Sequence, residues 1–286
     1  MKNRILLWLR IIRPQTLFAS LVPVLVGIIA VRRSGAAITS PHPVLTAAIT
    51  AICALALQIL SNLINDWYDF KRGTDKAGRA GFKRALAEGE VSGRQMLTAI
   101  FIDLGIVLAS GAFLVYEGRL VILLIGVSAI IFAYLYTATS HSLSYLGIAD
   151  IFVLLYYGVI ASGGTAYLLT HSYSSTAFYA GAVCGLISMG VLMINNLRDI
   201  EDDREAGKRT IPVRFGKRGG EAVMLAEILL MPVSALMAFG FSPAVFIVLP
   251  ALALYAGILR AKGTGYNSFL LANGLLNVVY LILCIF

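Results

Sequence analysis

The chain has 286 residues, of which 59% are apolar and 13% are charged, and its mean hydropathy is +0.84. These values exclude an ordinary soluble protein, because a soluble core of this size cannot bury so much apolar surface. The formal net charge is +8, but the basic residues follow a membrane topology, so the charge gives no reason to expect nucleic acid as a partner.

Nine predominantly apolar stretches, each near the roughly 20 residues needed to cross a hydrocarbon layer, predict an all-α integral membrane protein with nine transmembrane helices around a central cavity. In chain order the expected helices are Leu17–Val31, Pro43–Ile64, Met96–Val115, Leu120–Thr139, Tyr145–Leu169, Thr176–Asn196, Glu221–Phe239, Pro243–Ala261 and Phe269–Phe286. Residues 1–13 have no cleavage site after a short apolar core, so we expect an interfacial segment rather than a signal peptide. One transmembrane domain is expected over residues 1–286.

The basic residues predict the orientation of these helices, because Lys and Arg in short loops favour the cytoplasmic side. With a cytoplasmic N-terminus, all of the 23 basic residues except Arg32, Arg33 and Arg119 lie on the cytoplasmic side. We therefore expect a multi-pass protein of the cell inner membrane, surrounded by membrane lipids. Topology alone remains an alternative explanation for most of these charges.

Acidic residues are concentrated where the second expected helix ends. The sequence there reads Asn62-Leu-Ile-Asn65-Asp66-Trp-Tyr-Asp69. On a helix, Asn62, Asp66 and Asp69 lie within about 60° of one another. Their oxygens are therefore expected to converge on one helical face.

The same arrangement recurs where the sixth expected helix ends. The sequence there reads Asn195-Asn196-Leu-Arg198-Asp199-Ile-Glu201-Asp202-Asp203. Asn195 and Asp199 share a helical face with either Asp202 or Asp203, and the spacing permits both. Two matching clusters are thus expected at the cytoplasmic ends of the second and sixth helices.

Neighbouring carboxylates on a helix repel one another, so both clusters predict bound cations. Carboxylate and amide oxygens without His or Cys favour Mg²⁺ over Zn²⁺. A glycine and basic residues follow each cluster, Lys71-Arg72-Gly73 with Lys83-Arg84 in the first and Gly207-Lys208-Arg209 in the second. Carboxylates beside cations indicate a metal-bridged phosphate. The alternative is a pair of solvated, salt-bridged loops.

With these motifs, the sequence resembles the UbiA family of intramembrane aromatic prenyltransferases over nearly its whole length. Within that family it is most similar to the branch that prenylates 1,4-dihydroxy-2-naphthoate in menaquinone biosynthesis. The stretches that carry this resemblance are Arg13-Pro14-Gln15-Thr16, Asn65 to Phe70 with Gly73-Thr74-Asp75 and Lys83-Arg84, Tyr136-Thr137 with Tyr145 to Asp150, and Asn195 to Ile200 with Gly207 to Thr210. Two departures are Phe82, where that branch has a proline, and the Thr139–Ser142 linker, which lacks the expected Gly and Pro.

The resemblance implies a Mg²⁺-dependent transfer of a polyprenyl group from its diphosphate to an aromatic acceptor. It implies that Asp66, Asp69, Asp199 and Asp203 hold the metal, with Asp203 chosen over Asp202 by the family pattern. The residues implied to bind substrate are Asn62, Asn65, Asn195, Lys83, Arg84, Lys208, Arg209, Tyr136 and Arg13. Tyrosine rings near the cytoplasmic ends would stabilise an allylic cation, although such rings also form ordinary interfacial belts.

Asp150 is the isolated acid of greatest interest, because ionisable residues at membrane depth are costly and usually functional. We expect it to be catalytic, binding an acceptor hydroxyl or accepting a proton; its alternative role is to stabilise a helix N-terminus. Other acceptors remain open, namely 4-hydroxybenzoate, homogentisate or a glycerol-phosphate lipid. A membrane transporter is the alternative from another class, although transporters place their sites near the bilayer midplane. Prenyl length and oligomeric state remain open.

Overall fold

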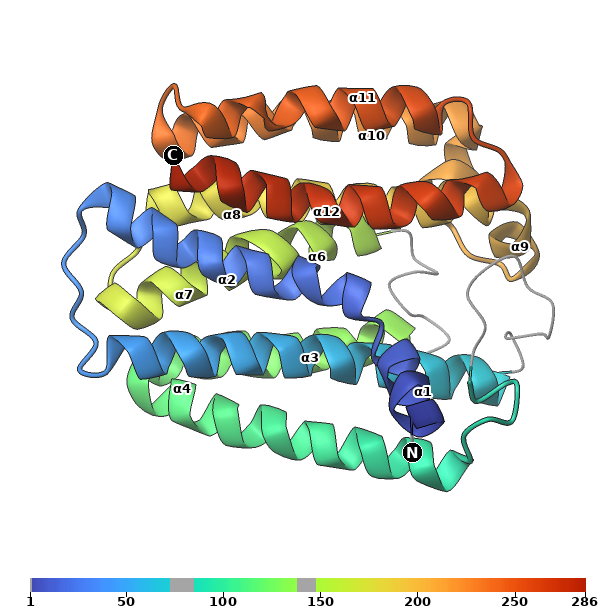
Figure 1. Ribbon diagram of the computed structural model, residues 1–286, viewed down its shortest axis with the longest axis horizontal. Coiled ribbons are helices and arrows are strands. Elements are labelled where there is room, and N and C mark those ends of the chain that lie inside the picture. The colour runs from blue at the N-terminus through green and yellow to red at the C-terminus, as the bar shows by residue number, and fades with distance from the viewer. Residues whose placement is uncertain (1, 73–84, 138–147) are drawn as a thin grey trace.

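The computed structural model describes residues 2–72, 85–137 and 148–286. Every regular element within these ranges is helical. In chain order, with the labels of Figure 1, they are α1 (Lys2–Ile12), α2 (Pro14–Ser34), α3 (Pro43–Arg72), α4 (Gly93–Thr137), α6 (Ala149–Leu154), η1 (Leu155–Val159), α7 (Ile160–Thr170), α8 (Ser175–Arg198), α9 (Ile200–Glu205), α10 (Ile211–Phe239), η2 (Pro243–Ile247), α11 (Val248–Ile258), η3 (Gly263–Gly265) and α12 (Tyr266–Ile285).

The long helices run side by side along the longest axis of the molecule (Figure 1). Seven helices of the described residues are long and apolar enough to cross a membrane, and residues Pro243–Ile258 form a shorter apolar helix. Large apolar side chains of α4, among them Phe101 and Leu108, are more than half exposed. Such a surface is suited to lipid rather than to water.

The expected third and fourth helices are the two arms of α4. The helix turns sharply at Arg119, whose backbone is non-helical (φ 55°, ψ −143°). No separate connecting loop is present there, contrary to the expected break between Val115 and Leu120. Because one of the seven candidate spans contains this turn, the expected number of nine transmembrane helices stays a prediction.

Small residues allow the central helices to approach closely. A Cβ added to Gly158 of η1 would lie 2.5 Å from the carbonyl oxygen of Gly181 on α8, and one added to Gly185 would lie 2.4 Å from the carbonyl oxygen of Leu154. Lipid is as apolar as Leu, so helices in a bilayer associate through packing and interhelical hydrogen bonds. These glycines therefore fix the position of the α6–η1–α7 segment against α8.

One end of the bundle carries α1, α9 and the last turns of α3 and α8, and we call it the motif end; it lies on the right in Figure 1. Helix α1 packs there through Ile11, which joins a buried cluster with Leu63 and Met96. Its opposite face is apolar and exposed, as expected of an interfacial segment, with Ile5 and Leu6 each at least 60% exposed. The chain then enters α2 through Arg13, which adopts a left-handed conformation (φ 58°).

Candidate functional site

The first motif lies on α3, which continues as a helix beyond the expected end at Ile64 to Arg72. Asn62 and Asp66 are buried, whereas Asn65 and Asp69 are half-buried. The side-chain amide of Asn62 donates hydrogen bonds to the backbone oxygen of Ile12 and to Thr16 Oγ1, each at 3.0 Å. This motif is therefore tied to the junction of α1 and α2.

A cation from that junction reaches the first motif. The guanidinium of Arg13 forms a salt bridge with the buried carboxylate of Asp66. The left-handed backbone of Arg13 is uncommon for a residue other than glycine. Arg13 lies where the chain changes direction from α1 to α2. The same residue therefore carries the left-handed backbone and the ion pair with Asp66.

The second motif differs from the continuous helix that its spacing predicted. Helix α8 ends at Arg198 and α9 begins at Ile200, because Asp199 between them is non-helical (φ −103°, ψ 20°). The backbone still carries a hydrogen bond from Asp199 N to Asn195 O at 3.0 Å and one from Asp203 N to Asp199 O at 2.8 Å. Asn195, Asp199 and Asp203 therefore remain one turn apart despite the break.

Burial distinguishes the two acids that spacing left equivalent. Asp203 is 5% exposed and accepts a hydrogen bond from Lys208 Nζ at 2.7 Å. Asp202 is exposed on the outer face of α9. The buried acid is thus Asp203, and its expected role as a metal ligand stays a prediction.

Asp199 is held by a fork from Arg198. Nε and Nη2 of the arginine each lie 2.6 Å from a carboxylate oxygen, and Nη1 donates to Asn267 Oδ1 at 2.7 Å. Both members of the pair are buried, with side-chain exposures of 6% and 8%. A bidentate guanidinium fixes the orientation of a carboxylate as well as its charge.

A cavity of about 300 Å³ with mixed polar and apolar walls, which we call the polar cavity, lies between the two motifs. Asn62, Asn65 and Asn195 line it from α3 and α8, together with the arginines Arg13 and Arg198. Asp66 and Asp199 lie behind this lining and are bonded to those two arginines. The asparagines of both motifs therefore face one cavity at the motif end.

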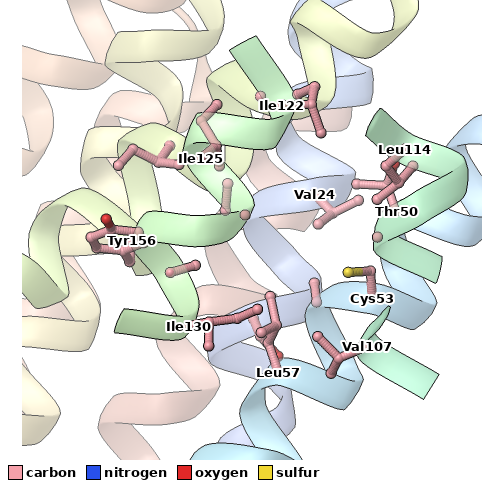
Figure 2. Close-up of a pocket in the computed structure, with 18 of the residues that line it drawn as sticks. Val24, Thr50, Cys53, Leu57, Val107, Leu114, Ile122, Ile125, Ile130 and Tyr156 are labelled. Atoms are coloured by element: carbon pink, nitrogen blue, oxygen red, sulfur yellow. The ribbon is translucent and has the colours of Figure 1, made fainter. Parts of the chain in front are cut away.

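A larger cavity of about 460 Å³ lies deeper in the bundle, between α2, α3, α4 and α7. Figure 2 shows its wall, where Val24, Leu57, Val107, Ile122 and Ile130 present apolar side chains. The two cavities share four lining residues, Gln58, Ser61, Phe132 and Tyr157. We call these four residues the junction, since they line both cavities.

Aromatic rings gather beside the junction. Phe132 stacks on Phe152 and on Tyr156, with centroid distances of 5.0 and 4.9 Å. Tyr156 and Tyr157 both belong to η1, a π-helical turn. Such turns occur often at functional sites, and this one directs two consecutive tyrosines to cavity walls.

Several expected site residues lie away from the cavities or outside the described ranges. Arg209 is exposed, and Lys208 contacts Asp203 rather than the cavity. Lys83 and Arg84 lie outside the described residues, as does the side chain of Tyr136. Their expected contacts with a diphosphate or a cation therefore stay predictions.

Asp150 is buried at the start of α6, one turn from the cavity-lining Val153. Its Oδ1 has no hydrogen-bond partner within the described part of the chain, nor has either carboxylate oxygen of Glu227 on α10. The two carboxyl groups are close enough to interact electrostatically. Asp150 therefore lies behind the cavity wall, and its expected catalytic role stays a prediction.

The structure adds residues that were not assigned from the sequence. Gln58 precedes Asn62 and Asp66 at intervals of four residues, so the helical period could have placed it on the same face. Arg198 lies within the second motif, but its spacing alone indicated no role in the site. The position of Tyr157 in the walls of both cavities depends on the π-helical turn η1, which no local sequence pattern indicates.

Comparison with known proteins gives three consistent results. Residues 20–268 match the model of the UbiA prenyltransferase family. The chain is 35% identical over 216 residues to 1,4-dihydroxy-2-naphthoate octaprenyltransferase of Escherichia coli (strain K12), covering 73% of this chain and 68% of that protein. It is 32% identical over 251 residues to the protein of the same name from Haemophilus influenzae, covering 85% and 79%.

The fold is also similar to that of solved structures. A UbiA homolog from Archaeoglobus fulgidus bound to DMAPP and Mg²⁺ superposes with a TM-score of 0.65 at 16% identity, covering 97% of both chains. At this identity the likeness concerns the fold alone. It shows that the helical bundle described above is a known arrangement.

Proposed function

The chain belongs to the UbiA prenyltransferase family, and from that premise we propose that it transfers a polyprenyl group from its diphosphate to 1,4-dihydroxy-2-naphthoate in menaquinone biosynthesis. One observation carries the proposal. The asparagines of two Asp-rich motifs, distant in sequence, line one polar cavity that shares four lining residues with an apolar cavity. A prenyl diphosphate has the same division into a charged head and an apolar tail.

The polar cavity is suited to the diphosphate. Arg13 and Arg198 line it and carry permanent positive charge, so they would bind phosphate oxygens. Their bonds to Asp66 and Asp199 hold the guanidinium groups in place. Lys208, Arg209, Lys83 and Arg84 are proposed to add positive charge around the entrance.

The donor atoms also fit Mg²⁺. They are carboxylate and amide oxygens, and the described residues contain no group of three or more His, Cys, Asp and Glu side chains that could hold a metal by themselves. Mg²⁺ typically uses one or two carboxylates together with substrate phosphates, so such a group is not required. We propose that Asp66, Asp69, Asp199 and Asp203 hold the ion, which when bound would neutralise charge on the leaving diphosphate.

The apolar cavity would hold the prenyl tail and keep water from the reacting carbon. Its walls provide aliphatic side chains and the ring of Tyr156 (Figure 2). The allylic carbon would then lie at the junction, where the ring of Phe132 borders both cavities. The carbon–oxygen bond breaks with its electrons going to the diphosphate, the ring carbon bonds to the allylic carbon, and a ring substituent leaves as H⁺ or CO₂.

The printed names of the curated relatives favour 1,4-dihydroxy-2-naphthoate over 4-hydroxybenzoate, homogentisate or a glycerol-phosphate lipid. The same names favour an enzyme over a transporter. The protein is a multi-pass membrane protein. We further propose that it forms one catalytic domain in the inner membrane, with its N-terminus and motif end on the cytoplasmic side, because the basic residues gather there.

An acceptor panel tests the proposal. Purified protein in detergent is incubated with Mg²⁺, a labelled polyprenyl diphosphate and one acceptor at a time, and products are separated by chromatography. We expect a prenylated naphthoquinol from 1,4-dihydroxy-2-naphthoate and no turnover after chelation of Mg²⁺. Turnover only with 4-hydroxybenzoate or homogentisate would overturn the acceptor, and full turnover by both Asp66→Ala and Asp199→Ala would overturn the mechanism.

A further inference from the structure

Three of the four proposed metal ligands form ion pairs with basic side chains of the protein itself. The pairs are Asp66 with Arg13, Asp199 with Arg198, and Asp203 with Lys208. A metal ion that binds any of these carboxylates has to compete with a positive charge that is already in contact with it. The position of each basic side chain decides how that competition ends.

Two of the basic side chains lie between their acid and the polar cavity. Arg13 and Arg198 line the cavity, whereas Asp66 and Asp199 lie behind that lining. In the first pair the arginine side chain is 18% exposed and the carboxylate side chain only 4%. A cation that enters the cavity therefore meets a guanidinium group before it meets either carboxylate, and like charges repel.

The guanidinium group of Arg198 is held by three bonds. It binds both carboxylate oxygens of Asp199 and also Asn267 Oδ1. Both charged side chains of the pair are buried. A metal ion that displaced Arg198 would leave a buried guanidinium group without its anion, which is strongly unfavourable. The exchange becomes favourable only if a second anion binds the guanidinium group.

The third pair is fixed by the way α9 ends. Gly207 adopts a left-handed conformation (φ 75°), and its N–H donates to the carbonyl oxygen of Arg204 at 3.1 Å. The N–H of Lys208 donates to the carbonyl oxygen of Asp203 at 2.9 Å. These two bonds form a Schellman motif, in which glycine ends a helix. The motif places Lys208 beside Asp203, and the lysine side chain is 27% exposed while that of the acid is 6% exposed.

A diphosphate is an anion that can bind these basic side chains in place of the carboxylates. Phosphate oxygens accept the same bidentate hydrogen bonds from a guanidinium group as a carboxylate does. Arg13 and Arg198 belong to the cavity wall that the diphosphate is proposed to contact. Once they bind phosphate oxygens, Asp66 and Asp199 become available to the metal ion that accompanies the diphosphate. Free Mg²⁺ brings no such anion.

We propose that Arg13, Arg198 and Lys208 keep free Mg²⁺ away from the motif acids, so that the protein binds the metal tightly only together with a diphosphate. This binding order rests on the proposed function and specifies how its metal site is filled. Linkage then requires that the metal and the diphosphate each raise the affinity for the other by the same factor. The three basic residues are positioning residues for the motif acids.

Equilibrium dialysis tests this binding order with Mn²⁺, which prefers the same oxygen ligands as Mg²⁺. Purified protein in a nonionic detergent is dialysed against Mn²⁺ alone, or against Mn²⁺ with inorganic pyrophosphate, at the same concentration of free Mn²⁺. Bound metal is the excess found in the protein compartment. We expect pyrophosphate to raise the Mn²⁺ affinity of the wild-type protein at least about tenfold, within the usual range for coupled sites.

Lys208→Gln is the first variant, and Arg204→Gln is its matched control. Both substitutions remove one positive charge from the end of α9, but Arg204 pairs with the exposed Glu201 rather than with a motif acid. Loss of a partly exposed ion pair changes an equilibrium by up to about fivefold. Lys208→Gln should therefore bind Mn²⁺ alone about fivefold more tightly than wild type, and Arg204→Gln should differ from wild type by less than about twofold.

Arg13→Gln is the second variant, because it removes the basic side chain in front of Asp66. It should also bind Mn²⁺ alone more tightly than wild type, and it should bind pyrophosphate more weakly when Mn²⁺ is absent. A merely structural role for Arg13 would not change the two affinities in opposite directions. Lys208→Gln alters a surface side chain, so the comparison with Arg204→Gln decides the question if Arg13→Gln fails to fold.

Three results would overturn the binding order. They are equal Mn²⁺ affinity of the wild type with and without pyrophosphate, equal gains in Lys208→Gln and Arg204→Gln, and unchanged affinity for Mn²⁺ alone in both Lys208→Gln and Arg13→Gln. Absence of bound Mn²⁺ under both conditions would overturn the proposed metal site as well.

The acceptor panel keeps this binding order separate from the proposed function, because inorganic pyrophosphate carries no prenyl chain and requires no aromatic acceptor. Coupled binding of Mn²⁺ and pyrophosphate without any prenyl transfer would overturn only the proposed reaction. Normal prenyl transfer together with tight binding of Mn²⁺ alone would overturn only the binding order.

Discussion

Replacing Asp203 with Asn tests whether the buried acid of the second motif is a metal ligand. The substitution keeps the size of the side chain and an oxygen that can accept from Lys208, whose Nζ lies 2.7 Å from the carboxylate. Asp202→Asn is the matched control, because the same chemical change falls one residue away on an exposed side chain. Lys208 is partly exposed, so the lost ion pair is worth about 1 kcal/mol or less, and both variants should melt near the wild-type temperature.

The two variants should differ strongly in activity. Loss of one carboxylate that binds the metal–diphosphate complex costs several kcal/mol of transition-state stabilisation, and about 3 kcal/mol corresponds to roughly a hundredfold loss of kcat. We expect this loss for Asp203→Asn, with a higher Mg²⁺ concentration needed for half-maximal rate. Asp202→Asn should stay within about twofold of wild type, since surface changes are usually small.

The assay measures prenylated product from labelled diphosphate at saturating acceptor, over a series of Mg²⁺ concentrations, with detergent-purified protein. Melting temperatures are recorded on the same preparations. Equal losses in Asp202→Asn and Asp203→Asn would refute the argument from burial. Wild-type activity of Asp203→Asn would refute its role at the metal.

Two glycine substitutions give further predictions, one about the apolar cavity and one about the packing of the helices. Gly126 lines the apolar cavity, and a Cβ added there meets no atom within 4 Å. Gly126→Phe should therefore fill part of the cavity without disturbing the backbone. The variant should prefer shorter prenyl diphosphates than the wild-type protein does, as measured by competition between donors of different length. Gly158→Ala would place a Cβ 2.5 Å from the Gly181 backbone oxygen and should destabilise the bundle by about 1–3 kcal/mol, which lowers the melting temperature by roughly several degrees. Gly163→Ala is its control, since no atom lies within 4 Å there, and equal melting of these two variants would contradict the packing argument.

Much of the candidate site could be predicted from the sequence because its residues recur at helical spacing. Asn62 and Asp66 lie on one face of α3, as the period of 3.6 residues requires. Asn62 and Asn195 line the same cavity. The break at Asp199 was not predicted, because spacing arguments assume a continuous helix. The contacts of Arg13 with Asp66 and of Arg198 with Asn267 span 53 and 69 residues, so no local pattern contains them.

By itself, the sequence determined the membrane character, the approximate extent of the apolar helices and the two Asn/Asp motifs at helix ends. These features depend on composition and on helical period, which are local properties. Only the tertiary structure decided that Asp203 is buried while Asp202 is exposed, and that Gln58 and Tyr157 line both the polar and the apolar cavity. Burial and cavity shape arise when helices distant in sequence pack together, and in lipid that packing depends on close steric fit rather than on apolar pattern.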